Sequence, residues 1–133
     1  MRIAVALAVA VLAGCGGGDG ASEEQVEHQV DLTVTVWPNG LGGDETTWVL
    51  QCLPEGGDHP DIEGACATLA SLDDPFGTPK PVARCEDIPG ATPEVARIKG
   101  TYLGRRVDEM FDRSSGCVFE RWDRLGTVFQ TGF

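Results

Sequence analysis

Hydrophobic and polar residues alternate with a period of two in two stretches of the chain. Asp31–Trp37 alternates in this way, is rich in β-branched residues and is followed by a Pro-Asn-Gly turn, so it predicts a strand. Thr46–Cys52 has the same character and predicts a second strand. Glu63–Leu72 instead carries apolar residues at helical spacing up to an Asp-Asp-Pro sequence, which predicts one amphipathic helix.

The last third of the chain has shorter and less regular patterns. Val95–Lys99 and Thr101–Phe111 predict a hairpin around Lys99-Gly100, with a bulge at Gly104 where the alternation of the second arm breaks. Two apolar pairs predict short closing strands, Val118-Phe119 and Val128-Phe129. Proline and glycine mark two further stretches as loops, Leu53–Pro60 and Glu86–Pro93. These patterns predict an α+β domain over residues 30–133, dominated by antiparallel strands.

The first residues have the character of an export signal. Ile3–Ala13 is an apolar run behind a single positive charge, and it is too short to span a bilayer as a helix. Residues 12–15 read Leu-Ala-Gly-Cys, which resembles the bacterial lipobox, in which the cysteine is lipidated and becomes the new N-terminus. We therefore expect residues 1–14 to be a lipoprotein signal peptide and 15–29 to be a lipidated, flexible tether. The alternative is a simple secretory signal cleaved nearby.

Length and charge narrow the classes of function. The chain has 133 residues, enough for one small domain, and a formal net charge of −11 at pH 7. Because binding to nucleic acid needs cations that neutralise phosphates, this excess of acidic side chains argues against a nucleic-acid partner. It also argues against docking on anionic lipid headgroups, so membrane association is expected through the lipid anchor alone. The sequence thus predicts an exported protein, anchored at the outer face of the cell membrane or secreted.

The chain has five cysteines, and the odd number is explained if Cys15 carries a lipid. The other four lie in the folded part of an exported chain, where thiols oxidise: Cys52, Cys66, Cys85 and Cys117. Three pairings are available, and the sequential one would close loops of about 15 and 33 residues. A zinc site is the competing use of four cysteines, but the chain has no close Cys-x-x-Cys pair, so no metal is expected.

Catalytic motifs are absent from the sequence. The chain has no Gly-x-Ser-x-Gly elbow, no phosphate-binding glycine loop and no His-Glu-x-x-His helix. Of its two histidines, His28 falls on the tether and His59 in a Gly/Pro loop, where a hydrogen-bonded structural role is commoner than that of a general base. We therefore expect neither an enzyme nor a cofactor.

Several short matches to one protein family lie in register along the folded part of the chain. They are Leu32–Val36, Val49–Pro54, His59-Pro60, Ala65–Leu69, Cys85, Gly100–Val107, Cys117, and Val128-Phe129 near the terminal Phe133. Four cysteines in register with His-Pro and a Gly-x-x-x-Gly-x-Arg-Val run make this set specific. By these residues the chain resembles the Streptomyces subtilisin inhibitor family, over essentially the whole domain.

The resemblance implies a fold, a pair of bridges and an activity. The fold would be an antiparallel sheet of about five strands with two short helices, and the two disulfides would be Cys52–Cys66 and Cys85–Cys117. Family members inhibit subtilisin-like and other serine proteases by presenting a rigid loop as a slowly cleaved substrate. Counted from Cys85, the loop residues would be Glu86, Asp87, Ile88 and Pro89, and the reactive bond Asp87–Ile88. Members also often form homodimers through the sheet.

The chain departs from the family pattern at this loop. The family usually has proline where Glu86 stands and a large apolar or basic residue where Asp87 stands. The stretch from Cys85 to Gly100 is also slightly longer than in the family. An aspartate that enters an apolar specificity pocket loses its hydration unless the protease supplies a cation. The alternative function is therefore a non-inhibitory cell-surface lipoprotein domain with a structural or partner-binding role.

Overall fold

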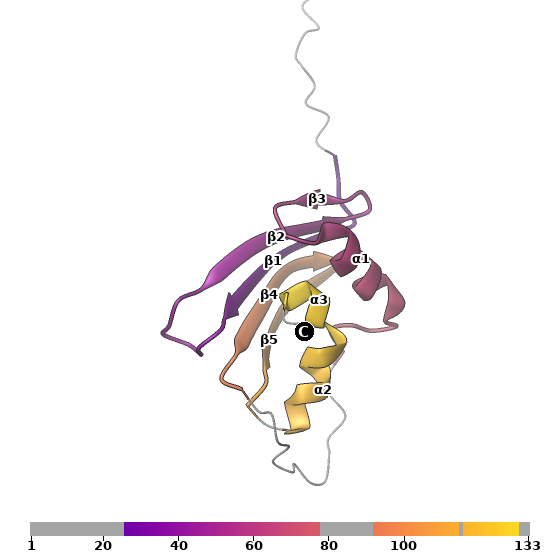
Figure 1. The fold of residues 1–133 in the computed structure, drawn as a ribbon. Coiled ribbons are helices and arrows are strands. Elements are labelled where there is room, and N and C mark those ends of the chain that lie inside the picture. Colours follow the sequence, from indigo (N-terminus) through magenta and orange to yellow (C-terminus); the bar gives the residue numbers. More distant parts are fainter. Residues whose placement is uncertain (1–25, 78–91, 115, 131–133) are drawn as a thin grey trace, which may run out of the picture.

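The structure is a computed structural model, and it describes residues 26–77, 92–114 and 116–130. In these ranges five strands form one antiparallel sheet, with helices packed on one of its faces (Figure 1). The strands are β1 (Val30–Trp37), β2 (Thr46–Cys52), β3 (Gly56–Gly57), β4 (Val95–Tyr102) and β5 (Arg105–Asp112), in the spatial order β3-β2-β1-β4-β5. The helices are α1 (Ile62–Ser71), α2 (Gly116–Arg124) and α3 (Gly126–Phe129). The α+β class and the five-stranded antiparallel sheet expected from the sequence are confirmed.

The three elements with regular sequence patterns form where they are predicted. In β1 the period-two pattern leaves every second residue buried against the helices: Val30, Leu32, Val34 and Val36. Its neighbour β2 has the predicted bounds and pairs with β1 along its whole length. The helix α1 begins after the N-cap Asp61, whose Oδ1 accepts the backbone N–H of Gly64 at 2.9 Å. The predicted loop between β2 and α1 contains the short strand β3, which pairs with β2.

The hairpin of β4 and β5 turns at Leu103-Gly104, and the prediction of a turn around Lys99-Gly100 is wrong. Leu103 (φ 48°) and Gly104 (φ 83°) both have positive φ, as many two-residue hairpin turns require, so Gly104 forms the turn and not a bulge. Gly100 lies inside β4, where a Cβ atom would come within 2.0 Å of the carbonyl oxygen of Asp31. The glycine that interrupts the sequence pattern therefore permits a close approach of β1 to β4.

The two apolar pairs near the C-terminus are helical, and the prediction of short closing strands there is wrong. Val118-Phe119 lies in α2 and Val128-Phe129 in α3, so the described residues form three helices where two were expected. Trp122, Leu125 and Phe129 recur at helical spacing and are fully or almost fully buried. An apolar pair alone does not distinguish a strand from a helix, and the longer spacing decides it here.

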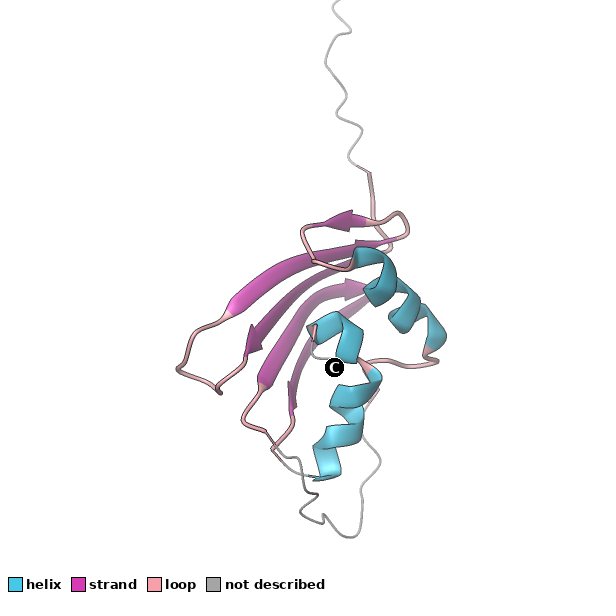
Figure 2. Ribbon diagram, viewed as in Figure 1, coloured by secondary structure: helices cyan, strands magenta, loops and turns pink. Residues whose placement is uncertain are grey.

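The hydrophobic core lies between the sheet and the helices (Figure 2). The helix α1 packs against β2 and α3, α2 packs against β5, and α3 also contacts β1. Aromatic rings occupy the part under the C-terminal helices. The ring centroids of Trp122 and Phe129 are 4.4 Å apart, and those of Phe129 and Phe111 are 5.2 Å apart. The core therefore ties both C-terminal helices to the edge strand β5.

One of the two expected disulfides is present among the described residues. Cys52 at the end of β2 is bonded to Cys66 in α1, with their Cα atoms 5.8 Å apart, so the bridge joins the helix to the sheet. Cys117 lies in α2, but Cys85 lies outside the described residues, as do Cys15 and residues 1–14. The second bridge, the signal peptide and the lipidation stay predictions. No helix in the described ranges combines the length and apolar character needed to cross a bilayer.

Candidate functional site

The described chain frames the segment that contains the predicted protease-contacting loop. Glu86, Asp87, Ile88 and Pro89 lie outside the described residues, because the described chain ends at Gly77 and begins again at Thr92. Gly77 follows α1 and Thr92 precedes β4. The part of the candidate site that the structure describes is therefore the pair of points where the chain leaves the domain and returns to it.

The point where the chain leaves is held by Phe76. Its ring is buried and meets the ring of Tyr102, the last residue of β4, edge to face with centroids 5.2 Å apart. The hydroxyl of Tyr102 donates a hydrogen bond to the carbonyl oxygen of Leu69 in α1 at 3.3 Å. Burial, and secondarily the nearby Asp74 carboxylate, raises the pKa of Tyr102 above its ordinary value. Because that ordinary value is already well above neutral pH, the hydroxyl is protonated and can donate.

The point where the chain returns is held by backbone hydrogen bonds that extend the sheet. The regular pairing of β4 with β5 begins at Val95 and Asp112. Beyond it, the N–H of Thr92 donates to the carbonyl oxygen of Arg113 at 3.1 Å, and the N–H of Arg113 donates to that of Glu94 at 3.2 Å. Thr92 is thus attached to the sheet although it precedes the strand. The two described ends of the segment lie at opposite ends of β4.

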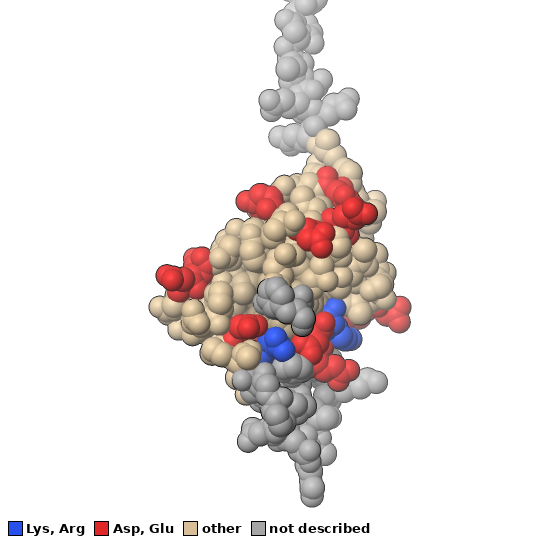
Figure 3. Space-filling model, in the orientation of Figure 1, with Lys and Arg blue, Asp and Glu red and all other residues tan. Residues whose placement is uncertain are grey.

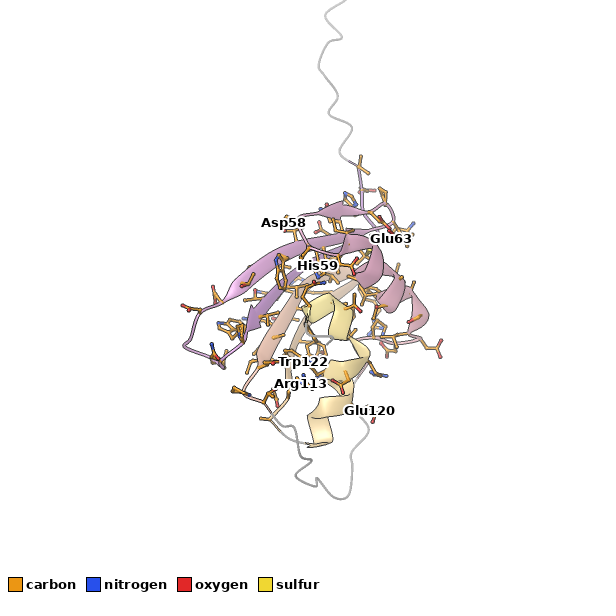
Figure 4. The ribbon with its side chains drawn as sticks, in the orientation of Figure 1. Asp58, His59, Glu63, Arg113, Glu120 and Trp122 are labelled. Atoms are coloured by element: carbon orange, nitrogen blue, oxygen red, sulfur yellow. A yellow bond between two sulfur atoms is a disulfide. The ribbon has the colours of Figure 1, made fainter. Side chains whose placement is uncertain are left out.

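Side chains add a second layer of contacts at this return point. The guanidinium of Arg113 lies between two carboxylates, with Nη1 3.7 Å from Oε2 of Glu94 and Nη2 3.6 Å from Oδ1 of Asp123 in α2. Figure 4 shows Arg113 beside Trp122, where the end of β5 meets α2. The side chains of Arg113 and Glu94 are only 17% and 22% exposed, so solvent and salt screen this pair less than a surface pair.

A second arginine fixes α2 on the sheet edge. Arg121 donates from Nη1 to the carbonyl oxygen of Met110 at 3.1 Å and from Nη2 to Oε2 of Glu109 at 3.0 Å. Its Cζ atom also lies 4.3 Å from the centroid of the Phe111 ring, in cation–π geometry. Because these partners all belong to β5, α2 cannot slide along the strand without breaking several contacts at once.

His59 has the structural role that the sequence favours. The ring is 4% exposed, and Figure 4 shows it between α1 and the strands. Its Nδ1 accepts the backbone N–H of Asp61 at 3.0 Å, so its Nε2 carries the hydrogen that is donated to the carbonyl oxygen of Val128 at 2.8 Å. Both nitrogens are therefore engaged by the backbone, and the ring is not free to act as a general base. His28 likewise hydrogen-bonds a backbone carbonyl, that of Pro54.

The charge distribution disfavours a polyanionic partner. Acidic side chains are spread over the face seen in Figure 3, and the few basic ones visible there lie toward α2. Within the described ranges no group of three or more histidine, cysteine or acidic residues could hold a metal ion. The sequence does not identify Arg113 and Arg121 as residues that hold the return point and α2 in place. A lone arginine in the sequence does not reveal which carboxylates lie near it.

Comparison with known proteins gives one informative match. No family model matches the sequence. A curated relative, Subtilisin inhibitor-like protein 1 of Streptomyces cacaoi, is 36% identical to this chain over 78 residues, which cover 54% of this chain and 68% of the relative. The relative is named as an inhibitor-like protein and not as an enzyme.

Proposed function

We infer the function of this chain from its family: it belongs to the subtilisin inhibitor-like proteins, and we propose that it inhibits a serine protease. Two features of the fold support this. The described residues form the five-stranded antiparallel sheet and the Cys52–Cys66 bridge that the family resemblance implies. The protease would take the loop after Cys85 as a slowly cleaved substrate, with Asp87–Ile88 as the reactive bond.

The observation that carries this proposal is the fixed return of the chain at Thr92. A loop inhibits rather than serves as an ordinary substrate when its ends are held, because little conformational entropy is then lost on docking. The backbone hydrogen bonds between Thr92, Glu94 and Arg113 supply such a hold four residues after Ile88. On the other side, the proposed Cys85–Cys117 bridge would tie the loop to α2, the helix that contains Cys117.

The residues of the loop favour a particular class of protease. Glu86 and Asp87 would enter the protease subsites before the cleaved bond, and a carboxylate is costly to bury without a cation. We therefore propose a serine protease whose specificity pocket carries a positive charge and accepts acidic residues. Subtilisin, with an apolar pocket, would bind much more weakly.

The experiment is a titration of the purified chain against subtilisin and a serine protease that cleaves after acidic residues. We expect stoichiometric inhibition of the second enzyme, and Asp87→Leu should weaken it by about 100-fold or more while strengthening the inhibition of subtilisin. Asp44→Leu is the matched control, because Asp44 is an exposed carboxylate outside the loop, and it should leave both inhibition constants unchanged. Absence of inhibition throughout, also by Asp87→Leu, would favour the non-inhibitory lipoprotein domain, the candidate that the two acidic residues suggest.

We also propose that the mature chain begins at Cys15, is anchored by a lipid on that residue, and dimerises through the sheet. The lipobox-like residues 12–15 support the anchor. The sheet face opposite α1, α2 and α3 has no helix of the described chain on it, which supports pairing of two copies there. If the chain is lipid-anchored, mass spectrometry of the mature protein should find a diacylglyceryl group on Cys15. If it dimerises, sedimentation should give twice the mass of one chain. An unmodified or later N-terminus would exclude the anchor.

A further inference from the structure

We propose that two copies of this chain associate along the outer edge of β5, so that their two sheets join into one continuous sheet. β5 is the last strand in the spatial order β3-β2-β1-β4-β5, and among the described residues no further strand pairs with its outer side (Figure 1). An unpaired strand edge presents a row of backbone donors and acceptors to another chain. This surface differs from the open face of the sheet, and the inference does not rest on protease inhibition.

The hydrogen bonds at the end of β5 show which backbone groups face this edge. The N–H of Arg113 donates to the carbonyl oxygen of Glu94 at 3.2 Å, so the backbone of Arg113 faces the strand β4. Backbone groups of an antiparallel strand point alternately toward one neighbour and the other. Counting back in steps of two, the backbone groups of Met110, Asp108 and Arg106 face away from β4 and toward the edge.

Arg121 limits the part of this edge that a second strand could use. Its Nη1 donates to the carbonyl oxygen of Met110 at 3.1 Å, which agrees with the outward direction of that carbonyl and also occupies it. Within the described ranges no group bonds the outward backbone groups of Arg106 and Asp108. The available edge is therefore the half of β5 that follows the hairpin turn.

The sequence of this half is complementary to itself in charge. β5 begins with Arg105-Arg106-Val107-Asp108-Glu109, in which two cations and two anions lie on either side of a valine. If a two-fold axis passes at Val107, antiparallel pairing sets Arg106 opposite Asp108 of the second copy. The same register sets Arg105 opposite Glu109 of the second copy. The axis repeats both contacts, so unlike charges meet at every charged position of the junction.

Backbone direction and charge together select this register. Arg106 and Asp108 both present their backbone groups outward, so they can exchange hydrogen bonds when they lie opposite each other. A shift by one residue sets outward groups against groups that already face β4, and no ladder forms. A shift by two residues sets Arg106 opposite Arg106 of the second copy, or Asp108 opposite Asp108 of the second copy. Like charges directly opposite each other destabilise such pairing.

The charged side chains of the junction are accessible in the single chain. Arg106 is exposed, and the side chain of Arg105 is 73% exposed. The side chains of Asp108 and Glu109 are 47% and 41% exposed. Each of these two acids contacts one arginine of its own chain, and its exposed side leaves room for a second arginine. No buried charge has to be uncovered for the two copies to meet.

Two exposed apolar side chains lie where the junction would cover them. Leu103 in the hairpin turn is 52% exposed, and Met110 is 43% exposed. In the register centred on Val107, Gly104 lies opposite Met110 of the second copy, so that methionine would lie beside Leu103. The pairing therefore covers apolar surface that the single chain leaves in water.

The contact is short, and we expect a weak dimer. Residues 105–109 of each copy take part, which is a smaller interface than stable dimers bury. Because the contact is rich in charge pairs at the surface, association should also weaken as the salt concentration rises.

The experiment measures self-association of the purified chain by sedimentation over a range of concentrations, with Cys15→Ser in every sample to exclude association through a lipid. We expect Arg106→Glu alone, and Asp108→Arg alone, to weaken self-association by about tenfold or more, because each sets like charges opposite one another. An equimolar mixture of the two variants should recover association, since in the mixed pair each introduced charge meets the opposite one.

Thr33→Glu is the control for pairing through the open sheet face. Thr33 is exposed in the central strand β1, between two residues that point into the core, so it lies on the opposite face. A charge there opposes stacking of two faces and leaves the edge of β5 unchanged, so association should equal that of the wild type. Urea unfolding of every variant shows that the fold is intact.

Hydrogen exchange gives a second readout, on the backbone itself. In the wild type the N–H groups of Arg106 and Asp108 should exchange more slowly at high than at low chain concentration. In Arg106→Glu the two rates should be equal for the N–H of Asp108. If Asp108→Arg does not fold, this comparison decides alone.

A wild type that stays monomeric at every concentration would overturn the edge pairing, as would a mixture of the two folded charge variants that does not recover association. Loss of association in Thr33→Glu, with wild-type association in Arg106→Glu, would assign the contact to the sheet face and equally overturn it. Failure to inhibit any protease would overturn the proposed inhibition alone, because none of these variants changes residues 86–89.

Discussion

His59 donates the hydrogen of its Nε2 to the carbonyl oxygen of Val128 across 2.8 Å, and so links the chain before α1 to the C-terminal helix α3. These residues are 69 positions apart in the sequence. The ring also meets Trp48 of β2 edge to face, with centroids 5.4 Å apart. One buried polar side chain therefore joins the beginning, the middle and the end of the domain.

We expect His59→Ala to lower the free energy of unfolding by about 3 kcal/mol. The change leaves a cavity and removes the partners of the Asp61 N–H and the Val128 carbonyl. Urea unfolding measures the loss. His28→Ala is the control, since that ring is less buried and makes a single hydrogen bond to Pro54, and it should cost less than about 1 kcal/mol. Equal losses for both variants would contradict the structural role of His59.

Gly100 should tolerate no side chain. Gly100→Ala would place a Cβ atom 2.0 Å from the carbonyl oxygen of Asp31 in the central strand, at a φ of +143°. We expect a loss of about 3 kcal/mol or more, because backbone on both sides must move. At Gly104 an added Cβ atom would have no atom within 4 Å, so Gly104→Ala should lower the free energy of unfolding only through the strain of the positive φ, by about 1 kcal/mol. The two variants are compared by thermal or urea unfolding. A cost of Gly100→Ala no larger than that of Gly104→Ala would show that β1 and β4 are farther apart.

The Arg97–Asp108 pair should make stability depend on pH in the acid range. The pKa of Asp108 lies below its ordinary value, chiefly because its carboxylate accepts hydrogen bonds from Arg97. Because the folded pKa lies below the unfolded value of about 4, the contribution of the pair is complete above that pH. It is lost as the pH falls through the folded pKa.

We therefore expect Asp108→Asn to be slightly less stable than the wild type at neutral pH. The difference should shrink as the pH falls below the unfolded pKa of about 4 and through the lower folded pKa. Urea unfolding at several pH values measures it. A difference that is constant across the acid range would show that the loss comes from packing and not from the ion pair.

The four cysteines of the domain should be paired in sequence order. A digest without reduction should join the peptides that contain Cys52 and Cys66, as the structure has them, and also those that contain Cys85 and Cys117. Removal of the first bridge by a double change to alanine should cost about 3 kcal/mol in the chain-entropy account. Any crossed pairing would contradict both the bridge and the proposed support of the loop by α2.

The sequence alone determined the elements whose pattern is local. The alternation in β1 and β2 and the helical spacing in α1 predict these three elements almost to the residue, because burial of one face imposes a period on neighbouring positions. Short matches along the chain are sufficient to indicate the family. The even number of cysteines left after Cys15 limited the bridges to three pairings, and one bridge of the sequential pairing is confirmed.

Only the tertiary structure decided the features that depend on distant segments. Gly100 looked like a turn because the reason for the glycine, the nearby Asp31 carbonyl, belongs to another strand. The spacing of Trp122, Leu125 and Phe129 already indicates helices near the C-terminus, but only the fold shows that Phe129 packs on both Trp122 and Phe111 of β5. Arg113 became part of the candidate site because folding brings Glu94 and Asp123 to either side of it. A periodic pattern records which face of an element is buried, but it does not record which other element covers that face.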